Sequence, residues 1–441
     1  MARVLMKGCE AIAEAAVRAG CRFFAGYPIT PQNEIPEYFA RRLPEVGGNF
    51  VQGESEVASI NMVYGSASVG ARSMTSSSSP GVSLKQEGIS YLAGAELPCL
   101  IVNVMRGGPG LGTIQPSQAD YFQTVKGGGH GDYRLIALAP ASVQEMADFV
   151  GLAFELAFKY RNPAIILADG VIGQMMEKVV LPVQKPRRTD AEVIEQCPWA
   201  TTGRTNGRKP NVITSLELKP EEMEKNNIRF QAKYKQIEEN EVRFEEIHCD
   251  DADYLIVAFG SMARIGQKAM ELAREEGIKV GMLRPITLWP FPTKAIAAYA
   301  DKVKGMLVTE LNAGQMVEDV RLAVNGKVND MFYYYREQAA LKAKQYQRAL
   351  DDMAKAIELN PEDLTYRAEL AVVNLRVGRY EEALNVLKAA LEKDPKYAEA
   401  YRLMGIAQLQ MKKDKEACAS FAKAKELGDP NVDALIEKHC K

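Results

Sequence analysis

Short apolar runs alternate with amphipathic stretches from residue 7 to about residue 181, and this alternation constrains the fold more than any other feature of the sequence. Strands are expected in six runs: RFFAGY, FVQG, ARSMTSSSS, LPCLIVNVMR, YRLIALAP and AIILADG. Helical patterns such as LKQEGISYLAGAE lie between them. Strands that alternate with helices of this length form a parallel sheet with helices on both faces. Ligands of such sheets bind at the carboxyl ends of the strands.

The alternation is interrupted once before it ends, and this interruption predicts the domain organisation. Residues 182–250 contain turn-forming segments and a charged, helix-like run, EEMEKNNIRFQAKYKQIEENEVRFEEI. We interpret them as an excursion between two domains. Strand patterns resume in DYLIVAFGS, IKVGMLRP and MLVTELNAG. The sequence therefore predicts an α/β chain with two doubly wound parallel-sheet domains, over residues 1–181 and 251–327.

A repeat of thirty-four residues replaces the strands after Lys327. AIELNP ends at Pro361 and ALEKDP ends at Pro395, and small or aromatic residues recur at the same spacing within each unit. The matching residues are Tyr346, Ala349, Met353 and Ala356, then Tyr380, Ala383, Leu387 and Ala390, then Ala417, Phe421 and Ala424, with Gly405 in the place of Ala371. This pattern resembles the tetratricopeptide repeat, a helix pair that stacks into a solenoid. We expect three repeats over residues 330–441, closed by a capping helix in NVDALIEKHCK.

The charge balance and the absence of certain segments exclude some classes of protein. The net charge is −2, so no overall field attracts nucleic acid or an anionic membrane. The first twenty-one residues lack the apolar core and cleavage site of a secretory signal, and no run approaches eighteen apolar residues. We therefore expect a cytoplasmic protein with neither a nucleic-acid nor a membrane partner.

Seven cysteines are scattered along the chain without a CxxC pair, and an odd count in a reducing compartment predicts free thiols. Any iron–sulfur cluster is then expected on another chain. The three histidines are far apart in the sequence, so no metal site is predicted.

Two carboxylates, Glu54 and Glu56, stand one residue apart in the stretch GESEVA, at the expected entry of a helix. Acidic side chains in a first helical turn complement the positive end of the helix dipole, so both could serve the helix alone. In GYPITPQ, Thr30 and Pro31 likewise fit the N-cap and the first turn of a helix.

Two further polar segments follow expected strands. TSSSSPGVSL, over residues 75–84, could present hydroxyl and backbone N–H groups to an anion, although serine-rich turns are usually only turns. Arg106 follows an apolar strand and precedes a glycine-rich run, where it could bind a carboxylate or phosphate, or simply face solvent. The sequence contains no GxSxG elbow, GxxxxGK[ST] loop or GxGxxG loop between a strand and a helix.

Several long segments together resemble the α subunit of the 2-oxoacid:ferredoxin oxidoreductases. They are GYPITPQNE, GESEVASINMVYG, MTSSSSPGVSLKQEGISYLAGAELPCLIVNVMRGGPGLGT, QPSQADYFQTVKGGGHGDYR, LAPASVQEMAD, AFGSMARIGQKA, LRPITLWPFP and ELNAGQMVEDVRLAVNGK. The resemblance covers about residues 1–327. It is strongest to the 2-oxoisovalerate (3-methyl-2-oxobutanoate) member, with the 2-oxoglutarate member next.

The resemblance implies a pyrimidine-type thiamine diphosphate-binding domain followed by a transketolase C-terminal-like domain. It places on Glu56 the glutamate that hydrogen-bonds the N1′ atom of the cofactor's aminopyrimidine. Pro28, Ile29 and Thr30 would also contact the cofactor, and Thr30 and Arg106 would hold the carboxylate of the 2-oxoacid. Because ADG at residues 168–170 lacks the partner asparagine of a magnesium motif, Asp169 is expected to be only a strand-end residue.

The resemblance also implies partners. A β subunit would supply the diphosphate and Mg²⁺ site, and small ferredoxin-like and γ subunits would complete the complex. Iron–sulfur clusters would lie on partner chains. The reaction would convert a 2-oxoacid, coenzyme A and oxidised ferredoxin into acyl-coenzyme A, carbon dioxide and reduced ferredoxin.

The repeats depart from this family and leave alternatives open. They could be a natural fusion that docks a peptide partner, or the product of a junction between neighbouring genes. A scaffold with a vestigial enzyme domain is a rival interpretation of the whole chain, and a 2-oxoglutarate-specific subunit is a rival substrate assignment.

Overall fold

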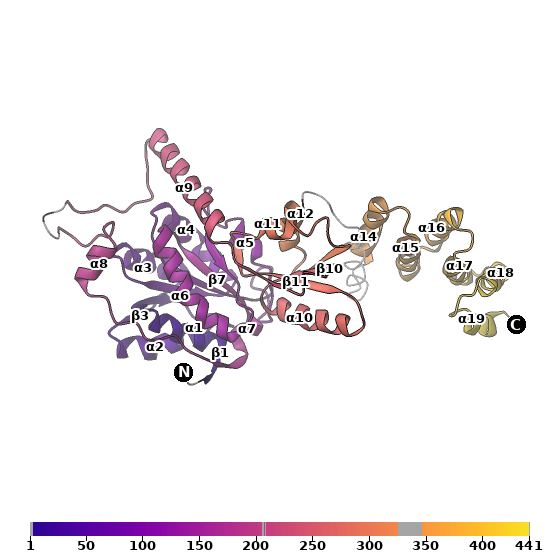
Figure 1. The fold of residues 1–441 in the computed structure, drawn as a ribbon, viewed down its shortest axis with the longest axis horizontal. Helices are drawn as coiled ribbons and strands as arrows, with labels where there is room; N and C mark the ends of the chain where they lie inside the picture. The colour runs from indigo at the N-terminus through magenta and orange to yellow at the C-terminus, as the bar shows by residue number, and fades with distance from the viewer. Residues whose placement is uncertain (1–2, 205–206, 208, 325–345, 441) are drawn as a thin grey trace. The chain divides into compact units, whose positions relative to one another are not determined.

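The structure is a computed structural model that describes residues 3–204, 207, 209–324 and 346–440. It divides into two compact units, Met1–Lys302 with Val308–Asn325 and Val303–Leu307 with Gly326–Lys441. Figure 1 shows the helices and strands of each. Within the described ranges, no helix combines the length and apolar character needed to cross a membrane.

A seven-stranded sheet with the order β12-β6-β7-β5-β4-β2-β3 forms the core of the first unit. Its strands are β2 (Phe23–Gly26), β3 (Asn49–Gln52), β4 (Ser73–Ser77), β5 (Leu100–Met105), β6 (Ile136–Leu138), β7 (Ala164–Asp169) and β12 (Thr287–Trp289). All pair in parallel except β12, which runs antiparallel to β6. The six strands expected before residue 181 are thus confirmed.

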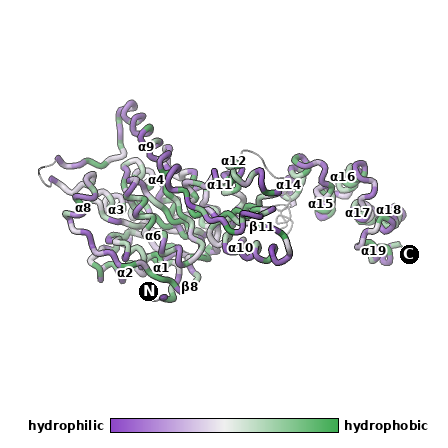
Figure 2. Tube along the Cα trace, viewed as in Figure 1, coloured by the Kyte–Doolittle hydropathy of each residue, from purple (hydrophilic) through white to green (hydrophobic). Residues whose placement is uncertain are grey.

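Helices connect the strands and cover the sheet. They are α1 (Gly8–Arg18), α2 (Glu34–Glu45), α3 (Glu56–Ser68), α4 (Pro80–Gly94), α5 (Tyr121–Val125), α6 (Val143–Tyr160) and α7 (Gly170–Gln174). Helix α1 packs on α6, and α3 packs on α4. Every residue of β5 and β7 is buried. Figure 2 colours the chain by hydropathy and shows hydrophobic segments inside the first unit. The continuous apolar runs therefore became central strands, as expected for a sheet covered on both faces.

The excursion between the two predicted domains contains α8 (Asp190–Gln196) and α9 (Pro220–Asn240). The charged helix expected to run through Ile247 ends at Asn240, and its last residues form strand β9 (Phe244–Ile247) instead. A small antiparallel sheet of β1 (Val4–Lys7) and β8 (Met176–Val179) was not expected. The boundaries at residues 181 and 250 stay predictions.

A second, four-stranded sheet has the order β13-β10-β11-β9. Its other strands are β10 (Tyr254–Ala258), β11 (Val280–Pro285) and β13 (Gly305–Thr309), and its helices are α10 (Gly260–Glu275), α11 (Thr293–Ala297) and α12 (Met316–Ala323). Strands β10 and β11 are parallel, whereas β9 is an antiparallel edge strand. Strand β12, just after β11, crosses to the first sheet and links the two α/β layers.

Apart from Val303–Leu307, the described residues of the second unit are helical and confirm the tetratricopeptide pattern. Its helices are α14 (Tyr346–Leu359), α15 (Leu364–Arg376), α16 (Tyr380–Lys393), α17 (Ala398–Gln410), α18 (Asp414–Glu426) and α19 (Asp433–His439). The repeating positions Ala383, Leu387 and Ala390 are fully buried, as are Ala417 and Phe421. The expected first helix of repeat one lies outside the described residues.

One sequence expectation about the repeats is wrong. Cys418 on α18 and Cys440 after α19 form a disulfide with Sγ atoms 2.02 Å apart, whereas free thiols were predicted. Helix packing brings the two residues to a Cα separation of 5.5 Å, which spacing along the chain does not reveal. The other five cysteines are free and buried.

Candidate functional site

The predicted site residues gather where four neighbouring parallel strands end. The loop after β2 carries Thr30, the turn after β3 leads to Glu56, and Arg106 follows β5 directly. Strands β3, β2, β4 and β5 are adjacent in the sheet, so their carboxyl ends share one edge. This edge is where ligands of open parallel sheets bind.

Burial separates the two carboxylates of GESEVA. Glu56 is the first residue of α3 and is only 5% exposed, whereas Glu54 is exposed. The helix is capped by Ser55, whose hydroxyl accepts a hydrogen bond from the N–H of Ala58 at 3.2 Å. Since Ser55 already caps the helix, the burial of Glu56 needs another explanation than capping.

The Glu56 carboxylate lies against the first turn of α4. A Cβ atom placed on Gly81 would stand 2.4 Å from the Oε1 atom of Glu56, so a larger residue there would push the carboxylate out of this position. In the described part of the chain, no hydrogen bond involves either carboxylate oxygen of Glu56. A buried carboxylate with free lone pairs can accept a hydrogen bond from a ligand nitrogen.

A lysine that sequence reasoning missed lies one helical turn beyond Gly81. The side chain of Lys85 is fully buried, and its Nζ atom donates to the backbone oxygen of Glu56 at 3.4 Å. Burial lowers the pKa of Lys85 to about 8, although the charge of Glu56 acts in the opposite direction. The site thus contains a buried positive charge beside Glu56.

The guanidinium of Arg106 joins the loops after β2 and β5. Its Nη1 atom donates to the backbone oxygen of Thr30 at 2.9 Å, and its Nη2 atom donates to that of Leu111 at 2.8 Å. The Nε atom is buried without a partner in the described chain. Arg106 is 7% exposed, so the solvated-loop alternative is excluded.

The loop around Thr30 differs from the expected helix cap. Helix α2 begins at Glu34 with Asn33 at its N-cap, so the prediction that Thr30 and Pro31 start the helix is wrong. Thr30 is exposed, and its hydroxyl accepts from the Nδ2 atom of Asn33 at 3.4 Å. Pro28 is exposed and Ile29 is half-buried in the same loop. All these groups remain accessible to a ligand.

A polar network that was not predicted holds Arg106 in place. The Ser79 hydroxyl accepts from the backbone N–H of Arg106 at 3.0 Å and donates to Oδ2 of Asp120 at 2.6 Å. The Nδ2 atom of Asn103 donates to the same oxygen at 2.9 Å. Burial raises the pKa of Asp120, while the bonds from Ser79 and Asn103 oppose the rise. The one sequence signal was an asparagine inside the apolar run LIVNVM.

Backbone strain accompanies this network. Ser79 has φ = 23°, a value that non-glycine residues rarely adopt, and it directly precedes α4. Such strain persists where surrounding contacts over-determine the conformation, as at ligand-binding sites. The hydroxyls of Ser77 and Ser78 beside it are buried without partners in the described chain. The serine run is thus a buried, strained turn, and anion binding by it stays a prediction.

Asp169 has the structural role that was expected of it. It ends β7 and accepts hydrogen bonds from the backbone N–H groups of Val171 and Ile172, which begin α7. Its Oδ2 atom accepts from the N–H of Ser261 at 3.0 Å and from Nε2 of Gln118 at 3.3 Å. These bonds tie the end of the first sheet to the start of α10.

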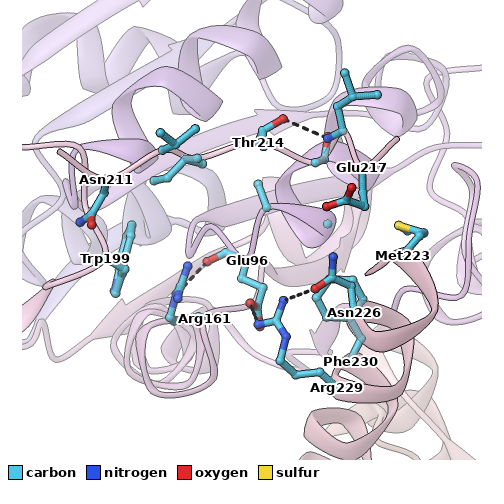
Figure 3. A pocket seen from close by; sticks show the side chains of 16 residues that line it. Glu96, Arg161, Trp199, Asn211, Thr214, Glu217, Met223, Asn226, Arg229 and Phe230 are labelled. Atoms are coloured by element: carbon cyan, nitrogen blue, oxygen red, sulfur yellow. Dashed lines mark hydrogen bonds and ion pairs between the residues drawn. The ribbon is translucent and has the colours of Figure 1, made fainter. Parts of the chain in front are cut away.

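A cavity of about 370 Å³ elsewhere in the first unit contains none of the predicted site residues (Figure 3). Glu96 pairs there with Arg229 and Lys233 of α9, and Arg161 lies 4.9 Å from the ring centre of Trp199. Because the buried carboxylate of Glu96 forms ion pairs with two residues of α9, we interpret this region as the anchor of α9 on the sheet.

Comparison with known proteins agrees with this geometry. Residues 14–246 match the family described as pyruvate flavodoxin/ferredoxin oxidoreductase, thiamine diphosphate-binding, and residues 252–341 match the pyruvate:ferredoxin oxidoreductase core domain II. The chain belongs to the 2-oxoacid:ferredoxin oxidoreductases. Residues 338–384 and 376–412 match tetratricopeptide repeat families. The family resemblance and its oxidoreductase class are therefore confirmed.

Relatives of this oxidoreductase family are named as subunits. The chain is 53% identical over 326 residues to ketoisovalerate oxidoreductase subunit VorB of Methanothermobacter thermautotrophicus, covering 73% of this chain and 90% of that one. It is 39% identical over 335 residues to 2-oxoglutarate synthase subunit KorA of Archaeoglobus fulgidus, covering 75% and 94%.

A solved oxidoreductase structure shares the fold. It is the 2-oxoglutarate:ferredoxin oxidoreductase from Magnetococcus marinus with 2-oxoglutarate, coenzyme A and succinyl-CoA bound, with a TM-score of 0.64 and 28% identity. The match covers 74% of this chain but only 60% of that chain.

Proposed function

We propose that the chain is the subunit of a 3-methyl-2-oxobutanoate:ferredoxin oxidoreductase that activates thiamine diphosphate through Glu56. The observation that carries this proposal is the buried Glu56 carboxylate, which lies against Gly81 with no hydrogen-bond partner in the described chain. A ring nitrogen that shares a proton with a carboxylate fits this arrangement. When bound, the cofactor supplies the carbanion and the electron sink for decarboxylation.

The remaining site residues have complementary roles in this proposal. Pro28, Ile29 and Thr30 would line the cofactor beside Glu56. Thr30 and Arg106 would hold the carboxylate of the 2-oxoacid, since a guanidinium forms strong charge-assisted hydrogen bonds with carboxylates. The exposed Thr30 hydroxyl and the hydrogen bond from Nη1 of Arg106 to the backbone oxygen of Thr30 support this role, because they hold both residues at one place. The network of Ser79 and Asp120 would keep Arg106 in position.

Exposed apolar side chains near this edge support a partner subunit. Leu111 is 80% exposed and Ile114 is 61% exposed in the loop after β5, and Leu84 on α4 is 56% exposed. Large apolar side chains exposed near a binding edge are what a partner protein would cover. We propose that a β subunit covers them and supplies the diphosphate and Mg²⁺ site. Small ferredoxin-like and γ subunits would complete the complex, and iron–sulfur clusters on partner chains would pass electrons to ferredoxin in the cytoplasm.

The substrate assignment depends on relatedness. Identity to the ketoisovalerate subunit is 53%, against 39% for the 2-oxoglutarate subunit. We therefore propose the branched 2-oxoacid, coenzyme A and oxidised ferredoxin as substrates, and the acyl-coenzyme A, carbon dioxide and reduced ferredoxin as products. The alternative substrate is 2-oxoglutarate, because the chain also matches the structure of a 2-oxoglutarate:ferredoxin oxidoreductase with a TM-score of 0.64.

The test compares two glutamates that are one residue apart. The chain is co-expressed with its partner subunits, and ferredoxin reduction is followed with 3-methyl-2-oxobutanoate, 2-oxoglutarate and pyruvate in the presence of coenzyme A. Glu56→Gln should lower kcat by roughly 100-fold or more, because proton transfer by a positioned group contributes that much. The exposed Glu54→Gln should retain wild-type activity.

Each outcome decides a different part of the proposal. Faster turnover of 2-oxoglutarate would replace the substrate assignment and keep the enzyme class. Equal activity of Glu56→Gln and wild type would remove Glu56 from the mechanism. A cofactor-loaded complex that reduces ferredoxin with none of the three acids would leave the scaffold interpretation, in which the repeats bind a peptide.

A further inference from the structure

Four arginines line one cavity of about 450 Å³ in the first unit. Arg22 directly precedes β2, and Arg72 directly precedes β4. Arg187 and Arg188 lie between β8 and α8. Because β2 and β4 are parallel neighbours, Arg22 and Arg72 meet at the amino ends of the strands. The cavity therefore lies at the opposite edge of the sheet from Glu56 and Arg106.

None of these four arginines forms an ion pair in the described part of the chain. Their hydrogen bonds go mainly to backbone oxygens: Arg22 donates to that of Val17 at 2.9 Å, and Arg188 donates to that of Gly70 at 2.7 Å. The Val17 oxygen belongs to the last turn of α1, and the Gly70 oxygen lies two residues past the end of α3. Each helix end carries roughly half a negative charge, so two ends offset only about one of four positive charges.

Two guanidinium nitrogens in the cluster lack a partner within the described residues. The Nε atoms of Arg22 and Arg72 are buried there without a hydrogen bond. Burial lowers the pKa of both residues, with further contributions from Arg187 on Arg22 and from Arg188 on Arg72. Like charges held close together are costly, and an anion bound between them would relieve their repulsion.

The rest of the lining adds an apolar wall and one acidic group. Outside the lining, the ring of Phe158 supports two of the guanidiniums, with its centre 5.7 Å from that of Arg72 and 5.2 Å from that of Arg188. The apolar wall of the cavity consists of Val69, Val193 and Ile194. Asp190 is the one acidic lining residue among those described, so a positive excess remains after it is counted.

We propose that this arginine cavity binds a small phosphorylated molecule. Guanidinium groups match phosphate oxygens in pairs, and several of them together select a multivalent anion over a monovalent one. The volume lies within the usual range for small-molecule sites, and the apolar wall suits a ligand with an organic part. A concave site of this size favours such a molecule over an extended acidic polymer.

The test measures binding of ADP and of inorganic pyrophosphate to the assembled complex by isothermal titration calorimetry. Arg188→Gln and Arg187→Gln should each weaken binding about tenfold or more, and added salt should weaken it further. Arg187 is exposed and its one hydrogen bond in the described chain joins Nη1 to the backbone oxygen of Gly47, so its replacement leaves the fold intact. Arg41→Gln removes an exposed positive charge outside the cavity and should bind as wild type does.

The affinities of ADP and pyrophosphate, and the effects of the variants on them, decide whether the cavity is a phosphate site. Tighter binding of ADP than of pyrophosphate assigns part of the affinity to the apolar wall, and equal binding assigns it to the arginines alone; both support the site. Binding that Arg187→Gln and Arg41→Gln change equally would overturn the proposal. It would also fail if neither probe binds and the arginine variants lose a partner subunit, because the cluster would then be a contact with an acidic protein.

Discussion

At the scale of single residues, Lys85 has the most unusual surroundings, a fully buried ammonium between α3 and α4. Its pKa is about 8 in the folded chain and about 10.4 in an unfolded one. Between these values the unfolded state binds more protons, so the free energy of unfolding rises with pH by at most about 1.4 kcal/mol per unit. Below pH 8 both states are protonated, and the cost of burying the charge is present in full.

We expect Lys85→Met to remove this pH dependence. The difference in unfolding free energy between Lys85→Met and wild type should decrease as pH rises from 8 to 10, measured by urea denaturation at several pH values. For the exposed Lys178→Met, the difference in unfolding free energy from wild type should be the same at every pH. A constant difference for Lys85→Met as well would contradict a buried, titrating lysine.

At the scale of helices and strands, the contact of α3 with α4 depends on glycine. A Cβ atom at Gly81 would lie 2.1 Å from Oγ of Ser77 and 2.4 Å from Oε1 of Glu56. Gly81→Ala should therefore displace Glu56 and weaken thiamine diphosphate binding at least tenfold in the assembled complex. Gly65→Ala on α3 meets nothing within 4 Å and should raise stability by up to about 1 kcal/mol. Equal cofactor affinity in the two variants would show that Gly81 does not position Glu56 for the cofactor.

A second element-scale prediction concerns the junction of β7 with α7 and α10. Asp169 is 1% exposed and accepts four hydrogen bonds, so Asp169→Ala leaves several buried donors unpaired. The free energy of unfolding should fall by about 3 kcal/mol or more. The exposed Asp148→Ala on α6 should cost less than about 1 kcal/mol. If chemical denaturation shows equal losses of unfolding free energy for Asp169→Ala and Asp148→Ala, the hydrogen bonds of Asp169 do not stabilise this junction.

The same scale shows what could be predicted from the sequence. Central strands such as β5 were recognisable because both of their faces are buried and their residues form continuous apolar runs. Strands β1, β8 and β12 were missed because they lie outside the strand–helix alternation and pair in antiparallel fashion with distant segments. Thr30 and Arg106 were identified together, whereas Lys85, Asn103 and Asp120 were not, because their importance depends on contacts between separate elements.

At the scale of the whole molecule, the repeats have apolar cores of their own. The clusters around Ala383 and Phe421 contain only residues of the helical unit. The repeats should therefore unfold separately from the α/β unit, giving two transitions in calorimetry. A single transition for the full chain, unchanged in a variant that destabilises only α18, would contradict this independence.

The disulfide belongs to the same unit and predicts which transition responds to reduction. Cys418 and Cys440 are 22 residues apart, so their link should stabilise the repeats by about 3 kcal/mol. Cys440→Ser and Cys418→Ser should lower the unfolding temperature of the repeats by the same amount and leave the unfolding temperature of the α/β unit unchanged. Dithiothreitol should have the same effect on wild type and none on either variant.

The presence of a separate helical unit on the same chain also has a consequence for the amounts of the two units in a cell. Because one polypeptide carries both units, every copy of the oxidoreductase subunit brings one copy of the helical solenoid with it. Translation therefore fixes their ratio at one to one, and no separate control of expression can change it. Whatever the solenoid binds is recruited in proportion to the abundance of the enzyme.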